Sequence, residues 1–287
     1  MLRSLSLRIA AVAAAITLPI FGLVAPAEAE SPYERGPDPT ASSLLDNGTF
    51  SLASTSVSSL VLGFGGGTIY YPTSTSEGTY GGIVLAPGYT ASSSMYASVA
   101  RRVASHGFVV FAIDTNTRLD QPGSRGQQIL AAVDYLKEDA SSAVASRLDE
   151  NRIAVSGHSM GGGGTLEAAN QDSSIKAAVA LQPWHTDKTW PGIRIPTMII
   201  GAELDTIAPV ATHSIPFYTS ATGASEKAYG EINNADHLIA NTDDDWQGRL
   251  FVTWMKRYLD EDTRYSQFLC PAPSSINLSD YRNTCPD

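Results

Sequence analysis

Short apolar segments alternate along the chain with segments of helical periodicity. Residues 82–86 and 108–113 are almost continuously apolar, and the segment 95–105 between them places its apolar side chains on one helical face. A strand, a helix and a second strand in this order predict two parallel strands joined by a crossover helix.

The same alternation continues toward the C-terminus. Further strands are predicted at 152–155, 177–181, 197–200 and 227–232, and further helices from Ser124 as an N-cap, after Ser159, over 212–219 and over 246–259. The sequence shows no internal repeat and no linker of the kind that separates domains. It therefore predicts one doubly wound α/β domain with a mostly parallel sheet.

The region before this alternation differs in pattern. Residues 56–64 and 67–71 read as two short strands joined through glycines, which predicts an antiparallel start to the sheet.

The N-terminus has the pattern of an export signal. Two arginines precede an apolar run, 9–24, and an A-x-A sequence ends at Ala29. A membrane anchor is the alternative, but Pro19 interrupts the run. We expect residues 1–29 to be a secretory signal peptide and residues 30–287 to be the single α/β domain.

Charge and cysteine content narrow the classes of partner. The formal net charge is −10 and there is no basic run, so nucleic acid and anionic membranes are poor partners. Uncharged polar and apolar substrates remain open, and we expect a monomer. The only two cysteines, Cys270 and Cys285, are expected to form a disulfide in an oxidising compartment, and they are too few and too far from histidine for a metal site.

One stretch carries candidate chemistry: "IAVSGHSMGGGGTL", residues 153–166. The pattern G-x-S-x-G falls at Gly157, Ser159 and Gly161, after a predicted strand and before a predicted helix, which is the context of a nucleophile elbow. A glycine-rich turn capped by serine is the structural alternative.

A serine nucleophile needs a histidine base, and in this type of fold the chain order is serine, acid, histidine. His237 and His213 both follow the serine and a later acid. His237 lies in a loop after a predicted strand, whereas His213 is expected on a helix at the wall of the cleft. His185, His158 and His106 are less suited by their positions.

Asp205 is the preferred acid, because it follows the apolar strand in "TMIIGAELDTIAP" and would emerge at the carboxyl edge of the sheet. Asp187, Glu203 and Asp236 remain open as alternatives. Two backbone N–H groups are expected to form the oxyanion hole: that of Met160 and that of Tyr89 in "APGYTAS".

The mature chain resembles the actinomycete-type bacterial cutinases and polyester hydrolases, which include hydrolases of poly(ethylene terephthalate). The resemblance runs almost end to end and is carried by "SPYERGPDPT", "APGYTAS", "FAIDTNTRLDQP", "GHSMGGGGTL", "LQPWH", "GAELDTIAPV", "FLCPAPS" and "YRNTCP". It implies an α/β-hydrolase fold without a lid domain and a serine esterase that needs no cofactor.

The resemblance also implies the walls of the cleft. The implied substrate-binding residues are Tyr89, Met160, Trp184, Ile207 and His213. Leu238 stands where many relatives have phenylalanine after the catalytic histidine. Some relatives bind calcium near this region; Glu203 could contribute a ligand here, but Asn233 stands where an aspartate is often found.

Few residues separate the strands ending near Pro183 and beginning at Thr197, too few for a helical cap, so polymer surfaces and short esters fit better than long triglycerides. The sequence thus predicts a secreted serine ester hydrolase of polyesters and short-chain esters. An esterase of soluble esters with incidental polymer activity is the alternative, and a non-catalytic surface-binding relative is a remote one.

Overall fold

The computed structural model describes residues 31–285. The expected signal peptide, 1–29, and its cleavage site lie outside the described residues. Within residues 31–285, every helix is too short or too polar to traverse a bilayer.

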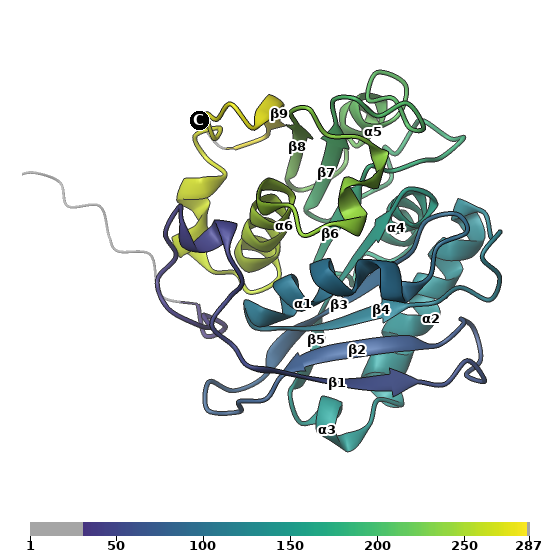
Figure 1. The fold of residues 1–287 in the computed structure, drawn as a ribbon, viewed down its shortest axis with the longest axis vertical. Coiled ribbons are helices and arrows are strands. Elements are labelled where there is room, and N and C mark those ends of the chain that lie inside the picture. Colours follow the sequence, from purple (N-terminus) through teal and green to yellow (C-terminus); the bar gives the residue numbers. More distant parts are fainter. Residues whose placement is uncertain (1–30, 286–287) are drawn as a thin grey trace, which may run out of the picture.

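One nine-stranded sheet forms the centre of the described chain, in the order β1-β2-β4-β3-β5-β6-β7-β8-β9 (Figure 1). The strands are β1 (Leu52–Val57), β2 (Gly67–Pro72), β3 (Tyr80–Ala86), β4 (Phe108–Ile113), β5 (Leu148–His158), β6 (Ala177–Leu181), β7 (Thr197–Ala202), β8 (Lys227–Ile232) and β9 (Leu278–Asn283). The six strands from β4 to β8 in this order pair in parallel, while β1, β2 and β9 pair antiparallel at the edges. The predicted mostly parallel α/β sheet is confirmed.

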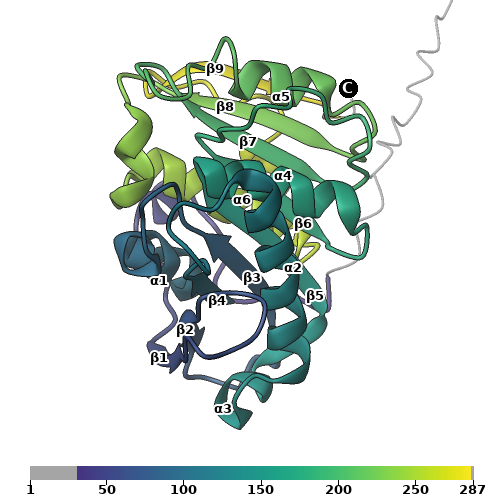
Figure 2. The ribbon, with the colours of Figure 1, turned by 90° about the vertical axis from the view of Figure 1, so that its right-hand side faces the viewer.

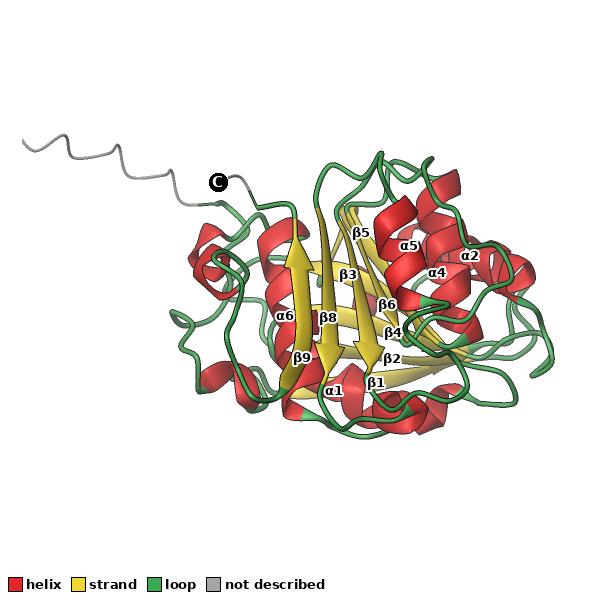
Figure 3. Ribbon diagram, turned by 90° about the horizontal axis from the view of Figure 1, so that it is seen from above, coloured by secondary structure: helices red, strands yellow, loops and turns green. Residues whose placement is uncertain are grey.

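Helices cover both faces of the sheet (Figure 3). The α-helices are α1 (Ala97–Ser105), α2 (Pro122–Glu138), α3 (Ser142–Ala145), α4 (Met160–Gln171), α5 (Ser214–Ser220) and α6 (Asp245–Tyr258). α1 and α6 pack on one face, and α2, α4 and α5 lie on the other (Figure 2). The continuously apolar strands are buried on both faces because helices cover both, as a parallel sheet requires.

Two sequence predictions about element bounds are wrong. The first strand lies at Leu52–Val57 instead of 56–64, and residues 58–66 form a loop. Gly66 has φ +83 and a Cβ there would lie 2.6 Å from the Val57 carbonyl oxygen, so this part of the chain turns too tightly to continue the strand.

The second error concerns the start of α2. The helix begins at Pro122 with Gln121 as N-cap, which lies three residues before the predicted Ser124 cap. Proline is favoured in the first helical turn because its missing N–H would have no helical partner there.

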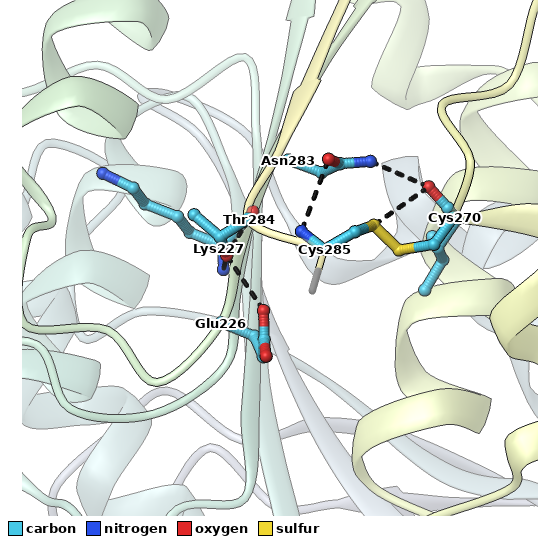
Figure 4. Close-up of a disulfide and its surroundings, with 7 residues drawn as sticks. Glu226, Lys227, Cys270, Asn283, Thr284 and Cys285 are labelled. Carbon is cyan, nitrogen blue, oxygen red and sulfur yellow. Dashed lines mark hydrogen bonds between the residues drawn. A yellow bond between two sulfur atoms is a disulfide. The ribbon is translucent and has the colours of Figure 1, made fainter. Parts of the chain in front are cut away.

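The C-terminal strand β9 was not predicted, and it is tied to the body of the protein. Cys270 and Cys285 form the expected disulfide, with Cα atoms 5.9 Å apart (Figure 4). The Asn283 side chain also donates to the Leu269 carbonyl at 2.9 Å. The disulfide therefore closes the segment that adds β9 to the sheet edge beside β8.

The carboxyl ends of the parallel strands meet at one edge of the sheet. Four chain segments follow β3, β5, β7 and β8 there, and they carry Tyr89, Ser159, Asp205 and His237 respectively. Open α/β sheets place their sites at this edge.

Between β6 and β7, residues 182–196 contain no helix, so no lid covers this edge from that segment.

Candidate active site

Ser159 sits at the turn from β5 into α4 with an unusual backbone conformation. Its φ is 55 and ψ is −120, and non-glycine residues rarely adopt a positive φ. The N–H of Ser159 donates to the Leu181 carbonyl at 3.0 Å, and its own carbonyl accepts from Trp184 at 2.8 Å. These bonds hold the strained turn against the end of β6.

The glycines around the serine are required by close packing. A Cβ on Gly157 would lie 2.4 Å from the Gly161 carbonyl oxygen, and one on Gly161 would lie 2.4 Å from that of Ala86. Both distances are well below van der Waals contact, so strand β5, helix α4 and strand β3 approach closely only because these positions lack side chains.

The serine, a histidine and a carboxylate form one line of contacts. His237 Nε2 lies 2.8 Å from Ser159 Oγ, and His237 Nδ1 lies 2.7 Å from Asp205 Oδ2. Because a carboxylate can only accept, Nδ1 carries a proton, and in a neutral ring Nε2 is then the acceptor that faces the hydroxyl. Ser159 itself is only 6% exposed.

The Asp205 carboxylate is held on both oxygens. Its Oδ1 accepts from the N–H groups of Ile207 at 2.8 Å and Ala208 at 2.7 Å. Burial raises the pKa of Asp205, but the hydrogen bonds from His237 and from these N–H groups outweigh it, so the pKa lies below its ordinary value. Asp205 therefore stands ionised beside His237.

The alternative acids are engaged elsewhere. Asp187 accepts from Thr189, Glu203 accepts from the N–H of Asn234 at 2.8 Å, and Asp236 accepts from the N–H of Leu238 at 2.9 Å. Asp205 is the acid that contacts the histidine.

The other histidines lie outside this line of contacts. His213 is the N-cap residue of α5, not a residue of the helix itself as expected, and its Nδ1 lies 3.0 Å from the Thr212 hydroxyl. His185 contacts Glu167 and His106 contacts the Asp46 carbonyl.

His158 is a residue whose contribution the sequence did not reveal. Its ring is buried behind the site, with its centroid 4.8 Å from that of His237. A histidine inside the elbow gives no signal for this placement, because its partners come from distant segments of the chain.

The two expected oxyanion donors lie near the serine. Tyr89 follows Gly88, and a Cβ on Gly88 would lie 3.1 Å from the Ser159 Cβ, so the Tyr89 loop packs directly against the nucleophile. Within residues 31–285, the N–H groups of Tyr89 and Met160 donate to no protein acceptor. Met160 is the first residue of α4, where N–H groups have no helical partner.

Arg125 supports this loop from below and was not predicted. It is fully buried, and it donates to the carbonyls of Pro87 at 2.9 Å and Arg118 at 3.0 Å. A charged side chain in an otherwise ordinary amphipathic helix gives no sequence signal for such a role.

A cavity of about 300 Å³ opens at the serine. Three of the expected substrate-binding residues line it together with Ser159 and His237, namely Tyr89, Ile207 and Leu238. The three are 48%, 56% and 52% exposed, so apolar side chains form an open rim.

The other expected walls stand differently. Met160 and Trp184 are half-buried and do not line this cavity. Trp184 is stacked on His213, with ring centroids 6.1 Å apart. Met95 and Asn241 line the cavity and were not expected.

The residues near the expected calcium position do not fit a calcium site. Calcium prefers several oxygen ligands, mostly carboxylates. Here Glu203 is occupied by the Asn234 N–H, and Asn233 donates its side-chain N–H to the Ile276 carbonyl at 2.7 Å. Among the described residues, no group of three or more acidic, histidine or cysteine side chains is placed to hold a metal ion.

A hydroxyl on a strained strand-to-helix turn, with a histidine and an ionised carboxylate behind it, is the arrangement of serine hydrolases on the α/β-hydrolase fold. Comparisons with known proteins agree with that class. The family model described as PET hydrolase-like matches residues 27–286.

Curated relatives are similar over most of their length. The chain is 53% identical to a bis(hydroxyethyl) terephthalate hydrolase of Streptomyces coelicolor, covering 99% of this chain and 94% of that protein. It is 56% identical to cutinase est1 of Thermobifida alba, covering 91% and 90%, and 51% identical to cutinase cut1 of Thermobifida fusca, covering 99% and 90%. The chain therefore belongs to the PET hydrolase-like family and is a serine-type ester hydrolase, which rules out the non-catalytic alternative.

Proposed function

We propose that this chain is a secreted esterase that cleaves polyesters, both cutin and aromatic polyesters such as poly(ethylene terephthalate), and short-chain esters through an acyl-enzyme. The observation that carries the proposal is the unbroken contact from Ser159 Oγ through the His237 ring to the Asp205 carboxylate. The names of the relatives support the choice of polyester as substrate.

In the first half-reaction, Ser159 Oγ attacks the ester carbonyl carbon while His237 Nε2 takes the hydroxyl proton. Asp205 stabilises the imidazolium that forms. Collapse of the tetrahedral intermediate breaks the bond to the alcohol, which leaves with the proton from His237. Water then attacks the acyl-serine by the same route and releases the acid.

The N–H groups of Tyr89 and Met160 would donate hydrogen bonds to the developing oxyanion. Preorganised donors of this kind contribute about 3 to 4 kcal/mol each to transition-state stabilisation. In the described part of the chain neither N–H donates to a protein acceptor, which supports this role.

The shape of the cavity supports a bulky substrate. It is open, its rim is apolar, and the segment 182–196 adds no helix above it. A chain emerging from a solid polymer could reach the serine without entering a tunnel, and aromatic or aliphatic repeat units would lie on Tyr89, Ile207 and Leu238.

Export is the proposed route to such a substrate. The N-terminal segment 1–29 has the signal pattern, and the disulfide between Cys270 and Cys285 is typical of proteins in oxidising compartments. One chain supplies every residue of the site, which supports a monomer.

The test compares residues 30–287 with Ser159→Ala on two substrates: an amorphous aromatic polyester film, followed by release of soluble acids, and p-nitrophenyl butyrate. Release from the film that depends on Ser159 is the expected result. Butyrate cleavage without film release would refute the polyester substrate and favour an esterase of soluble esters.

A further inference from the structure

A chain of hydrogen bonds runs behind the catalytic residues and joins two parts of the site. The Gly88 N–H donates to the Tyr96 hydroxyl at 3.0 Å, and that hydroxyl lies 2.8 Å from His158 Nδ1. On the other side of the ring, His158 Nε2 lies 2.8 Å from the carbonyl oxygen of His237. The chain thus begins in the Tyr89 loop and ends on the backbone of the proposed base.

The direction of each bond follows from the chemistry of its ends. A carbonyl oxygen only accepts, so His158 Nε2 must carry the ring proton and Nδ1 must accept from the Tyr96 hydroxyl. The hydroxyl oxygen is then free to accept from Gly88. Each group therefore has one available role, and the structure fills it.

Burial fixes both rings in their neutral forms. Tyr96 is 1% exposed and His158 is 3% exposed. Burial lowers the pKa of His158 to about 3 and raises that of Tyr96 to about 12. No change of protonation near neutral pH therefore reverses the direction of the chain of bonds.

Packing leaves little slack between the bonded groups. A Cβ on Gly88 would lie 3.1 Å from the Ser159 Cβ, 3.2 Å from His158 Nδ1 and 3.3 Å from the Tyr96 hydroxyl. Ser159, the Tyr89 loop and the rings of Tyr96 and His158 thus pack around one point, and a displacement of one moves the others.

We propose that Tyr96 and His158 are positioning residues that set the distance between the Tyr89 loop and His237. Tyr96 holds the loop that carries the Tyr89 N–H, and His158 holds the backbone of His237, whose ring must stay in contact with Ser159. This role rests on the proposed function of the site. A misplacement of about 1 Å can cost about 100-fold in rate, so the loss of either bond at this point has a large effect.

Tyr96→Phe tests the proposal with the least disturbance, because it keeps the ring and removes the hydroxyl. Tyr80→Phe is a matched control: Tyr80 is also buried, and its hydroxyl donates to the Ser74 carbonyl at 3.0 Å, but it begins β3 at the end opposite the site. His158→Leu removes both bonds of the ring, and His158→Gln retains an amide that can still donate.

The measurements are kcat and KM for p-nitrophenyl butyrate at 25 °C, with the melting temperature of each variant. Tyr96→Phe is expected to lower kcat about tenfold with KM within about twofold, whereas Tyr80→Phe lowers the melting temperature and keeps kcat. His158→Leu should lower kcat at least as much, and His158→Gln should recover part of the loss. The variant that combines Tyr96→Phe with His158→Leu should be no slower than His158→Leu alone, because both changes break the same chain of bonds.

An unchanged kcat in folded Tyr96→Phe would overturn the proposal, as would an equal loss in Tyr80→Phe. If His158→Leu does not fold, the comparison of Tyr96→Phe with Tyr80→Phe decides alone. Ser159→Ala, measured beside them, distinguishes a failure of the proposed function from a failure of the positioning role. Activity that survives in Ser159→Ala would refute the proposed function itself.

Discussion

The buried half of the site and its exposed rim are built on different principles. In the buried half, Ser159, Asp205 and His237 each have defined hydrogen-bond partners, and most of these partners belong to the backbone of neighbouring loops. At the rim, Tyr89, Leu238 and their neighbours present apolar side chains to solvent.

The difference separates chemistry from selectivity. Bonds in the buried half are strong because water is excluded, and they hold reacting atoms in one geometry. The rim is held by few directional contacts, so its side chains can change with little cost to the fold. We expect substitutions in the buried half to reduce turnover on every ester, and substitutions at the rim to change which ester is preferred.

The largest expected effect comes from the nucleophile and base. Ser159→Ala and His237→Ala should each lower kcat on p-nitrophenyl butyrate by about 10⁴-fold or more, since neither retains an activated hydroxyl. Circular dichroism should show the fold retained. A rate within tenfold of the parent in folded Ser159→Ala would remove the basis for the comparison.

Asp205→Asn should follow closely. The amide leaves the geometry nearly intact but no longer requires Nδ1 to carry the proton and no longer stabilises the imidazolium, so kcat should fall by about 10³- to 10⁴-fold. Asp187→Asn, at an exposed acid bonded only to its own loop, is the matched control. Equal losses in the two variants would contradict the assignment of Asp205.

The Cys270–Cys285 disulfide lies outside both halves of the site. Replacing Cys270 and Cys285 by serine opens a loop with a sequence separation of 15, which should lower the free energy of unfolding by about 3 kcal/mol. The melting temperature should fall by roughly 6 to 12 °C, with kcat at 25 °C unchanged. A loss of kcat in the folded variant would show that β9 affects the site.

The pH dependence of stability probes the buried neutral histidines. Burial lowers the pKa of His106 to about 4, whereas in the unfolded chain it lies near 6.5. As the pH falls, His106 is therefore protonated in the unfolded chain before it is protonated in the folded protein. The free energy of unfolding decreases between about pH 6.5 and pH 4, by roughly 3 kcal/mol at most.

Urea unfolding of His106→Gln across this range should show a shallower decline than the parent. An identical slope in the two proteins would contradict the burial of a neutral His106. Replacing a rim residue such as Ile207 should leave the slope unchanged, because the rim carries no buried charge.

The smallest effect is expected at the rim. Leu238→Ala removes apolar surface at the edge of the cavity and should reduce release from polyester film by about fivefold, corresponding to about 1 kcal/mol, with kcat on the butyrate ester within about twofold. Leu62→Ala is the control, since Leu62 is 93% exposed beside α2 and does not line the catalytic cavity. Equal losses on both substrates would break the division between the two halves.

Much of this structure could be predicted from sequence because its signals are local. Continuous apolar runs predicted the parallel strands, and the spacing of Gly157, Ser159 and Gly161 predicted the turn on which the nucleophile sits. Chain order and strand ends led to Asp205 and His237, which the structure places in contact.

The remainder depends on contacts between distant segments. The edge strand β9 has a polar, alternating sequence and is stabilised by pairing with β8 and by the disulfide, not by a buried apolar run. The positions of Tyr96, Arg125 and His158 behind the site follow from side-chain bonds across many residues of sequence, which no local pattern records.

The most direct test of the central claim is covalent labelling by an organophosphonate, followed by mass spectrometry of the intact chain and its peptides. We predict one phosphonyl adduct per chain, on Ser159, with labelling strongly slowed in His237→Ala. Absence of an adduct on the folded protein, or an adduct on another residue with Ser159 unmodified, would contradict the account.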